Sequence, residues 1–201
     1  MAEILRLKKG CKISLDTVLH EGYEVSENYI TANVSIDKIK DVLIHFIEIH
    51  DEPLFFILEL PANADDELEV KPGVVDSFHK DVYYIDGCSG DEAEVILEEI
   101  GNILYNDGLV SFGFGGHKSA DEIMFGNYNI LRIYSKDISS FDGFLEEHKI
   151  ERVDNLVTAW DVISKDNPGV CVRYDEDGKS VYDIPEDFKD WGIYLAEQRE
   201  E

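Results

Sequence analysis

The chain is organised around residues 109–134, whose sequence is LVSFGFGGHKSADEIMFGNYNILRIY. Its first part is rich in aromatic and β-branched residues, which favour a strand, and a second stretch of this kind ends it. Between the two lie the clustered glycines Gly113, Gly115 and Gly116, which are typical of a tight turn. We therefore expect two strands joined by a glycine-rich corner and a short polar segment.

Two β-α-β units precede this stretch. In the first unit, Pro53 and Pro61 bracket a nearly continuous apolar run, LFFILEL, which is typical of a strand buried on both faces. Before that run, a β-prone segment is followed by apolar residues at helical spacing. The first unit is predicted to consist of strand 29–34, helix 36–51 and strand 54–60.

The second unit repeats this order. Ser89 is a suitable N-cap for its helix, and Asp91 and Glu92 in the first turn complement the helix dipole. Apolar residues then recur at helical spacing up to residue 104. The second unit is predicted to consist of strand 82–86, helix 89–106 and strand 109–114.

The order β-α-β followed by β-α-β is that of the split, ferredoxin-like arrangement. Its two helices cover one face of an antiparallel sheet, so the predicted fold class is α+β. The alternative is a three-layer α/β fold with a parallel sheet, which needs a helical connection that residues 61–81 do not supply. We expect one compact domain over residues 1–201, with the βαββαβ core at 28–116 and an α/β extension at 117–201 packed on it.

The extension is predicted to contain one strand, three helices and a hairpin. The apolar residues of its helical segments recur at helical spacing, so each helix has one face to bury. The predicted elements are strand 129–134, a short helix from Ser139 or Ser140 to His148, a helix over 153–163, a hairpin of 170–174 with 179–182, and a final helix that starts at the capping box Asp183–Glu186 and carries Phe188, Trp191 and Leu195.

Acidic residues dominate the charge of the chain. Eighteen Lys and Arg against 44 Asp and Glu give a formal net charge of −26. A surface of this sign repels phosphate backbones and anionic membranes and attracts basic proteins. Basic patches with interleaved aromatic residues are missing from the sequence. We therefore expect a basic protein as the partner, with neither nucleic acid nor membrane bound.

The cysteines and the apolar runs indicate a soluble, cytoplasmic protein. Cys11, Cys88 and Cys171 form no C-x-x-C pair, so neither a disulfide framework nor a zinc site is predicted. The longest apolar run, Leu54–Leu58, is too short to span a bilayer, and no apolar segment follows the first basic residues.

The glycine corner is the candidate ligand site, because clustered glycines let backbone N–H groups approach an anion. The corner is not a P-loop, since His117 separates the last glycine from the lysine. Ser119–Glu122 also matches a capping box, so a helix that begins there needs no anion, and the glycines can serve a tight turn alone. No cofactor is predicted. The candidate ligand-binding residues are Gly113, Gly115, Gly116 and Lys118.

His117, Asp121 and Glu122 are the catalytic candidates. A histidine beside carboxylates can act as a general base or bind a metal ion. The alternative is a solvated loop histidine among many acids. No nucleophile elbow, G-x-S-x-G, accompanies them.

His45 and Glu48 on the predicted helix 36–51 are the candidate metal ligands. His45 and His50 are five positions apart and diverge on a helix, unlike the i, i+4 pair of a zinc helix. We therefore predict no metal site of the zinc-helix kind.

These features favour a non-enzymatic protein that binds and masks a basic partner. Its overall character is that of small acidic bacterial proteins of the immunity or inhibitor type that neutralise nuclease toxins, and dense negative charge would speed such an encounter. The alternative is a small-molecule-binding or hydrolytic enzyme that uses the corner around His117. Because ferredoxin-like sheets host many activities, the fold does not decide between them.

Overall fold

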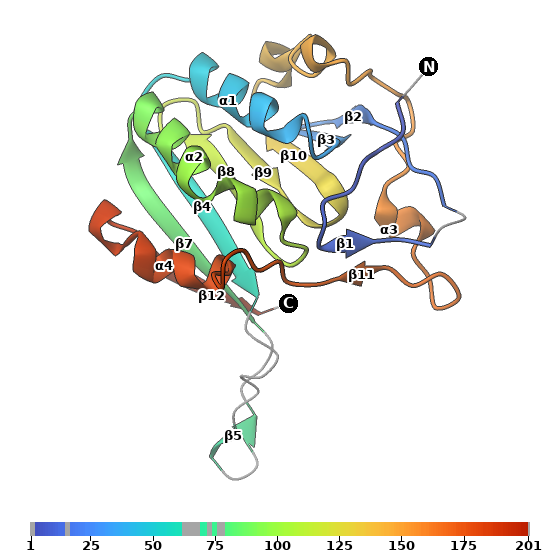
Figure 1. Cartoon of the computed structure of the whole chain (residues 1–201). Helices are drawn as coiled ribbons and strands as arrows, with labels where there is room; N and C mark the ends of the chain where they lie inside the picture. Colours follow the sequence, from blue (N-terminus) through green and yellow to red (C-terminus); the bar gives the residue numbers. More distant parts are fainter. Residues whose placement is uncertain (1–2, 15–16, 62–68, 72–73, 76–78, 201) are drawn as a thin grey trace.

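One large antiparallel sheet forms the centre of the protein. The computed structural model describes residues 3–14, 17–61, 69–71, 74–75 and 79–200. Within these residues, eight strands pair in the order β12-β7-β4-β8-β9-β10-β3-β2 (Figure 1). In chain order they are β2 (Gly22–Ser26), β3 (Tyr29–Asn33), β4 (Leu54–Pro61), β7 (His79–Cys88), β8 (Ser111–Gly116), β9 (Glu122–Phe125), β10 (Ile130–Tyr134) and β12 (Tyr194–Glu200).

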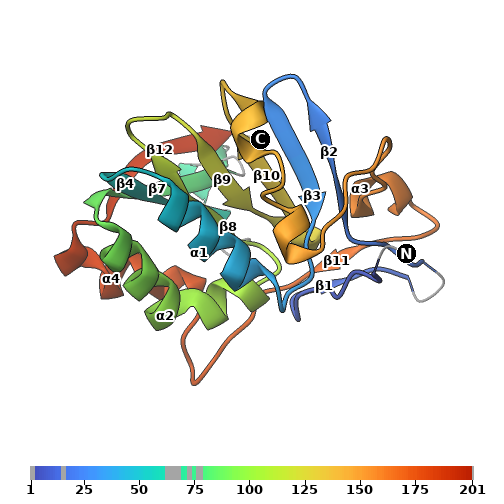
Figure 2. The same cartoon turned by 90° about the horizontal axis from the view of Figure 1, so that it is seen from above.

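Two long helices, α1 (Ile39–Ile49) and α2 (Gly90–Asn106), lie side by side on one face of this sheet (Figure 2). Their apolar stripes pack on alternate residues of the strands, such as Phe56 of β4 and Phe114 of β8, both fully buried. Ser89 caps α2 through the predicted capping box with Glu92. The α+β class and the predicted helices and strands of the two β-α-β units are therefore confirmed.

The strand order differs from the predicted ferredoxin-like one. In that arrangement the two units interleave, and β3 would lie next to β7. Here β4 lies between β7 and β8, and β9 and β10 separate β8 from β3. The reason is local. β8 continues through a tight turn into β9 and β10, and β9 occupies the hydrogen-bonding edge of β8 that does not pair with β4.

The glycine corner leads into this hairpin, and the helix predicted from the capping box Ser119–Glu122 does not form. The hydroxyl of Ser119 accepts a hydrogen bond from the amide of Asp121 (3.1 Å), and the amide of Gly116 donates to the carbonyl of Asp121 (2.9 Å). No apolar helical stripe follows the box. Residues 122–125 alternate between the two faces of the sheet instead.

Three further predictions for the extension are wrong. Of helix 153–163 only the single turn α3 (Ala159–Val162) forms. Residues 170–174 do not pair with 179–182, because β11 (Val170–Cys171) pairs with β1 (Cys11–Lys12). The final helix ends early. After α4 (Ile184–Asp187), Gly192 at φ +80° turns the chain into β12, which hydrogen-bonds to β7 and forms the edge of the sheet.

Short elements complete the structure. Between β4 and β7, β5 (Glu69–Lys71) pairs with β6 (Val74–Val75), and residues 62–68, 72–73 and 76–78 of this connection lie outside the described residues.

No helix of the described part of the chain is long and apolar enough to cross a membrane. Within the described ranges, the 3₁₀ turns are η2 (Asn127–Asn129), η3 (Ile138–Phe141), η4 (Glu146–His148), η5 (Val181–Asp183) and η6 (Lys189–Trp191).

A buried asparagine fixes the N-terminal segment to the sheet. The side-chain oxygen of Asn129 accepts from the amide of Lys8 (2.8 Å), and its amide group donates to the carbonyls of Arg6 (3.1 Å) and Val34 (2.9 Å). Asn129 adopts φ +63°, a left-handed conformation that asparagine tolerates better than most residues. Residues 6–8 therefore lie at the junction of β3 and β10.

Replacing Gly113 with alanine is expected to lower the free energy of unfolding by roughly 3 kcal/mol. The new Cβ would lie 1.8 Å from the carbonyl oxygen of Ile123, so β8 and β9 would have to separate. Urea-induced unfolding measures this change. Gly90→Ala in the first turn of α2 is the matched control, because the nearest atom to its Cβ is 3.6 Å away. Equal stability of the two variants would contradict the close β8–β9 pairing.

Candidate functional site

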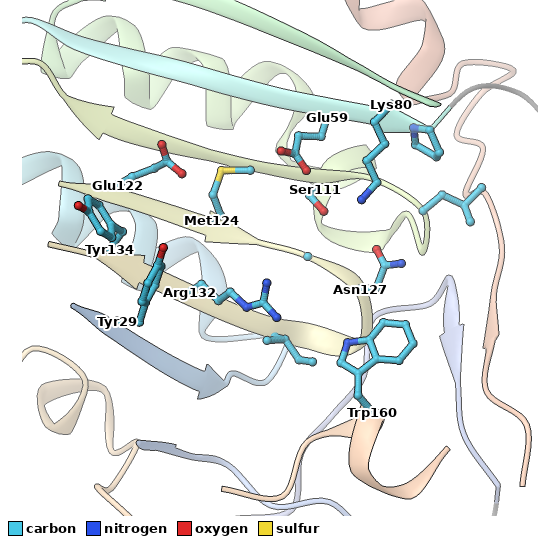
Figure 3. A pocket seen from close by; sticks show the side chains of 14 residues that line it. Tyr29, Glu59, Lys80, Ser111, Glu122, Met124, Asn127, Arg132, Tyr134 and Trp160 are labelled. Atoms are coloured by element: carbon cyan, nitrogen blue, oxygen red, sulfur yellow. The ribbon is translucent and has the colours of Figure 1, made fainter. Parts of the chain in front are cut away.

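The sheet face that α1 and α2 leave uncovered carries a pocket of about 540 Å³. Figure 3 shows side chains from β3, β4, β7, β8, β9, β10 and α3 around it. Pockets of this volume are within the range of ligand sites, and they also receive anchoring side chains at protein interfaces. The pocket is therefore the starting point for a functional interpretation.

Glycines of β8 shape this face without lining the pocket. A Cβ at Gly115 would lie 2.2 Å from the ring of Phe55, and one at Gly113 would lie 2.9 Å from the sulfur of Met124. The missing side chains therefore let Phe55 and Met124 lie across β8. Gly116 is next to the hydroxyl of Ser119, in the turn. The predicted glycines thus act through close packing, of side chains at Gly115 and also of the β9 backbone at Gly113.

Glu122 on β9 is the most informative residue of the pocket. Burial raises the pKa of its carboxyl group, the nearby Glu59 adds to this effect, and Arg199 opposes it. Glu59 is itself paired with Arg199, at 2.7 Å. The carboxylate of Glu122 makes no hydrogen bond or ion pair within the described part of the chain. A half-buried acid of this kind can be satisfied by a basic group that enters from outside.

Two tyrosines lie beside Glu122. Tyr134 of β10 is directly opposite Glu122 in the register, and Tyr29 of β3 is directly opposite Tyr134. The two rings have centroids 5.2 Å apart, and Tyr29 is 50% exposed. Their faces are available to a cation, which aromatic rings attract. This end of the pocket therefore combines a carboxylate with one exposed and one half-buried aromatic ring.

The opposite end has a different character. Figure 3 shows Lys80, Asn127 and Trp160 there, with Arg132 between the two ends. Arg132 is exposed and makes no ion pair with any described acid, and Trp160 is 55% exposed. The pocket thus has an acidic, aromatic end and a basic, polar end.

The catalytic candidates are distributed over three places. His117 lies in the β8–β9 turn, with its Nε2 3.2 Å from a carboxylate oxygen of Asp86 on β7 and its ring against Phe55. Asp86 also accepts a hydrogen bond from the hydroxyl of Tyr194. Both His117 and Asp86 are almost half exposed. His117 has a carboxylate partner, but it comes from β7.

Asp121 is on the helical side of the sheet and pairs with His50. Its carboxylate is 3.1 Å from Nε2 of His50, and both side chains are almost fully buried. The Nδ1 of His50 is 2.6 Å from the carbonyl oxygen of Phe46. Each ring nitrogen therefore faces an oxygen acceptor, and the imidazolium form donates to both. The pair connects the end of α1 to the β8–β9 turn.

Lys118 and the metal candidate His45 line a second, more open cleft of about 670 Å³, between α1 and the segment containing η3 and η4. His45 contacts His148, with 3.0 Å between ring nitrogens, and burial followed by the charge of His45 lowers the pKa of His148. Glu48 is exposed and is not part of this contact. The described residues contain no group of three or more potential ligands that could hold a metal ion.

His117 and the pocket present different chemical groups. In the described residues His117 contacts no hydroxyl or thiol that it could activate as a nucleophile. The pocket, in contrast, presents aromatic rings and charges of both signs at an open surface. Comparisons with protein-family models, curated proteins and solved structures found no match to this chain.

The sequence interpretation missed Tyr29, Arg132, Tyr134 and Trp160. A signal for three of them was present. Tyr29, Arg132 and Tyr134 occupy alternate positions in strands that were predicted, so they had to share the face opposite the apolar residues between them. Trp160 carried no such signal, because its helix was predicted to bury it, whereas α3 leaves it at the rim of the pocket.

Glu122→Gln is expected to stabilise the protein at pH 7. The pKa of Glu122 is raised in the folded state, so its ionised form costs stability that is recovered as pH falls to about 4. The variant should therefore have the higher thermal midpoint at pH 7, and the difference should shrink towards zero near pH 4.

Glu98→Gln on the exposed side of α2 is the matched control, because it removes the same formal charge from a solvated position. Thermal unfolding of the three proteins across this pH range makes the comparison. If both variants changed the thermal midpoint equally at every pH, net charge alone would explain the change. Ionisation of the half-buried Glu122 would then cost no stability.

Proposed function

We propose that this protein is non-enzymatic and binds a basic protein partner, which it masks in the manner of an inhibitor. The observation that supports this most directly is the half-buried carboxylate of Glu122, unpaired in the described structure, beside two tyrosines in an open pocket. A lysine or arginine of the partner would satisfy that carboxylate and stack on Tyr134 and Tyr29.

The composition of the pocket supports protein recognition. Tyrosine, tryptophan, methionine and arginine are enriched at protein interfaces and among the residues that dominate binding energy. Tyr29, Met124, Arg132 and Trp160 supply all four types in one pocket. A sheet face with exposed aromatic side chains, free of covering helices, also offers the flat area that a protein partner needs.

The charge of the chain supports a basic partner. At −26, the protein attracts cationic proteins at long range. α2 carries five acidic residues and no basic one, and none of these acids forms an ion pair with a described lysine or arginine. Because α2 lies on the other face of the sheet, its charge contributes to the long-range field, while Glu122 acts on contact.

A small-molecule ligand is the second candidate, and the volume of the pocket favours it. A ligand with a cationic group at one end and an anionic or polar group at the other would match Glu122 and Arg132. This form of the alternative moves the predicted ligand site from the corner around His117 to the neighbouring open face of the sheet.

Affinity capture from the source organism should retain a basic protein at low salt. The captured protein, once purified, should bind the wild type, and its association rate should fall steeply as salt rises. Glu122→Gln and Tyr29→Ala should each increase the dissociation rate about tenfold, since they remove a pocket contact.

The α2 variant Glu98→Gln/Glu99→Gln is the control, and it should slow association without changing dissociation. Capture of no basic protein, or capture that the pocket variants leave unchanged, would remove the support for this proposal. Stabilisation of the protein by a metabolite, lost in Glu122→Gln, would favour the small-molecule alternative.

A further inference from the structure

The short ribbon of β1 and β11 brings two cysteines together. Cys11 and Cys171 are directly opposite in the antiparallel register, and their sulfur atoms are 3.5 Å apart. The amide of Val172 donates to the carbonyl of Gly10 (2.8 Å), so the adjacent cysteine pair is of the non-hydrogen-bonded kind, in which opposed side chains lie closest. Both thiols are free. Bond formation requires the sulfurs to approach to about 2 Å, a small movement of two side chains.

A buried lysine adjoins this pair. Lys8 is 1% exposed, and its Nζ has no hydrogen-bond partner among the described residues and lies 5.0 Å from the centre of the Phe125 ring. Burial lowers the pKa of Lys8, while Cys11, Asp107 and Cys171 favour its charged form. A lysine placed in a core without a partner is costly unless a nearby anion offsets it. A thiolate at the cysteine pair is such an anion.

The two thiols are chemically unequal. A hydrogen bond from Cys11 lowers the pKa of Cys171 to about 7, and Tyr128 and Lys8 act in the same direction. The pKa of Cys11 is raised, because it donates this bond and is buried. Cys171 is half-buried between two exposed valines, whereas Cys11 is 4% exposed. Cys171 is thus the accessible member of the pair.

We propose that Cys11 and Cys171 form a redox site, in which a small hydroperoxide oxidises Cys171 and Cys11 then closes a disulfide. The site rests on the register and the sulfur distance of the pair, on the accessibility of Cys171, and on the unpartnered Lys8 beside them.

The reaction proceeds in two balanced steps. The Cys171 thiolate attacks one oxygen of hydrogen peroxide, the O–O bond breaks, and the other oxygen leaves as hydroxide and takes up a proton to form water. This step leaves a sulfenic acid on Cys171. The sulfur of Cys11 then attacks that sulfenic sulfur, the S–O bond breaks, and the proton of Cys11 leaves with the oxygen as a second water. The pair loses two electrons, and the peroxide gains them.

The disulfide would join two segments that are far apart in the sequence. Residues 11 and 171 are 160 positions apart, so the bond closes almost the whole protein into one loop and restricts the unfolded chain. Tyr128 connects the pair to the pocket, because its ring packs edge-on against Trp160 with 5.1 Å between centroids. Oxidation would remove the ionisable thiol of Cys171, whose pKa Tyr128 helps to lower.

The test uses the reduced, full-length protein and hydrogen peroxide at a twofold molar excess. After peroxide is removed and free thiols are alkylated, intact mass should show one alkylated cysteine, and a peptide map should show Cys11 linked to Cys171. In Cys11→Ser, dimedone should label Cys171 as a sulfenic acid. Lys8→Met should slow oxidation about tenfold, because the thiolate loses its neighbouring cation.

Cys88→Ser is the matched control and should oxidise at the wild-type rate, since Cys88 is buried and burial raises the pKa of its thiol to about 11. The peptide map of the wild type decides the question even if a variant fails to fold. Three alkylated cysteines after treatment, a disulfide that includes Cys88, or a Cys171→Ala variant that consumes peroxide as fast as the wild type would overturn the proposal.

Discussion

The close approach of β8 and β9 at Gly113 is the constraint on which the rest of the structure depends. No Cβ fits there, because the carbonyl of Ile123 occupies its place. This contact lets β9 and β10 extend the sheet from β8 to β3, so that one sheet holds both β-α-β units and the extension. The bare backbone of β8 also lets Phe55 and Met124 lie across it, and the adjoining pocket forms on that face.

Local patterns predicted the parts of the fold that local forces determine. The apolar stripes of α1 and α2, the capping box at Ser89 and the apolar run of β4 led to the correct elements. Local patterns could not predict the strand order, because the order depends on which strand pairs with each hydrogen-bonding edge. The extension was predicted least well. There, the helical spacing in residues 153–163 and near Leu195 was overridden by contacts with distant strands.

Closeness in sequence likewise did not predict which candidate residues lie together in the structure. His117, Asp121 and Glu122 are close in sequence, but the alternation of a strand sends Asp121 to the helical side and Glu122 to the open face. Treating residues 119–122 as a helix start concealed this alternation. The character of the acidic and aromatic end of the pocket follows from this placement of Glu122. Glu122 is half-buried and has no partner among the described residues of a strongly acidic protein, and a cationic side chain of the proposed partner would supply the missing charge.

Glu122 is proposed to anchor a basic side chain beside Tyr134 and Tyr29, and a titration followed by NMR tests this contact. Protein labelled with ¹³C at its glutamate carboxyl groups is titrated with the peptide acetyl-Gly-Arg-Gly-amide, and then with the same peptide carrying neutral citrulline. The account predicts a saturable shift of the Glu122 carboxyl signal with the arginine peptide alone, accompanied by the ring signals of Tyr29 and Tyr134. Shifts confined to the carboxylates of α2, with Glu122 unchanged, would contradict it.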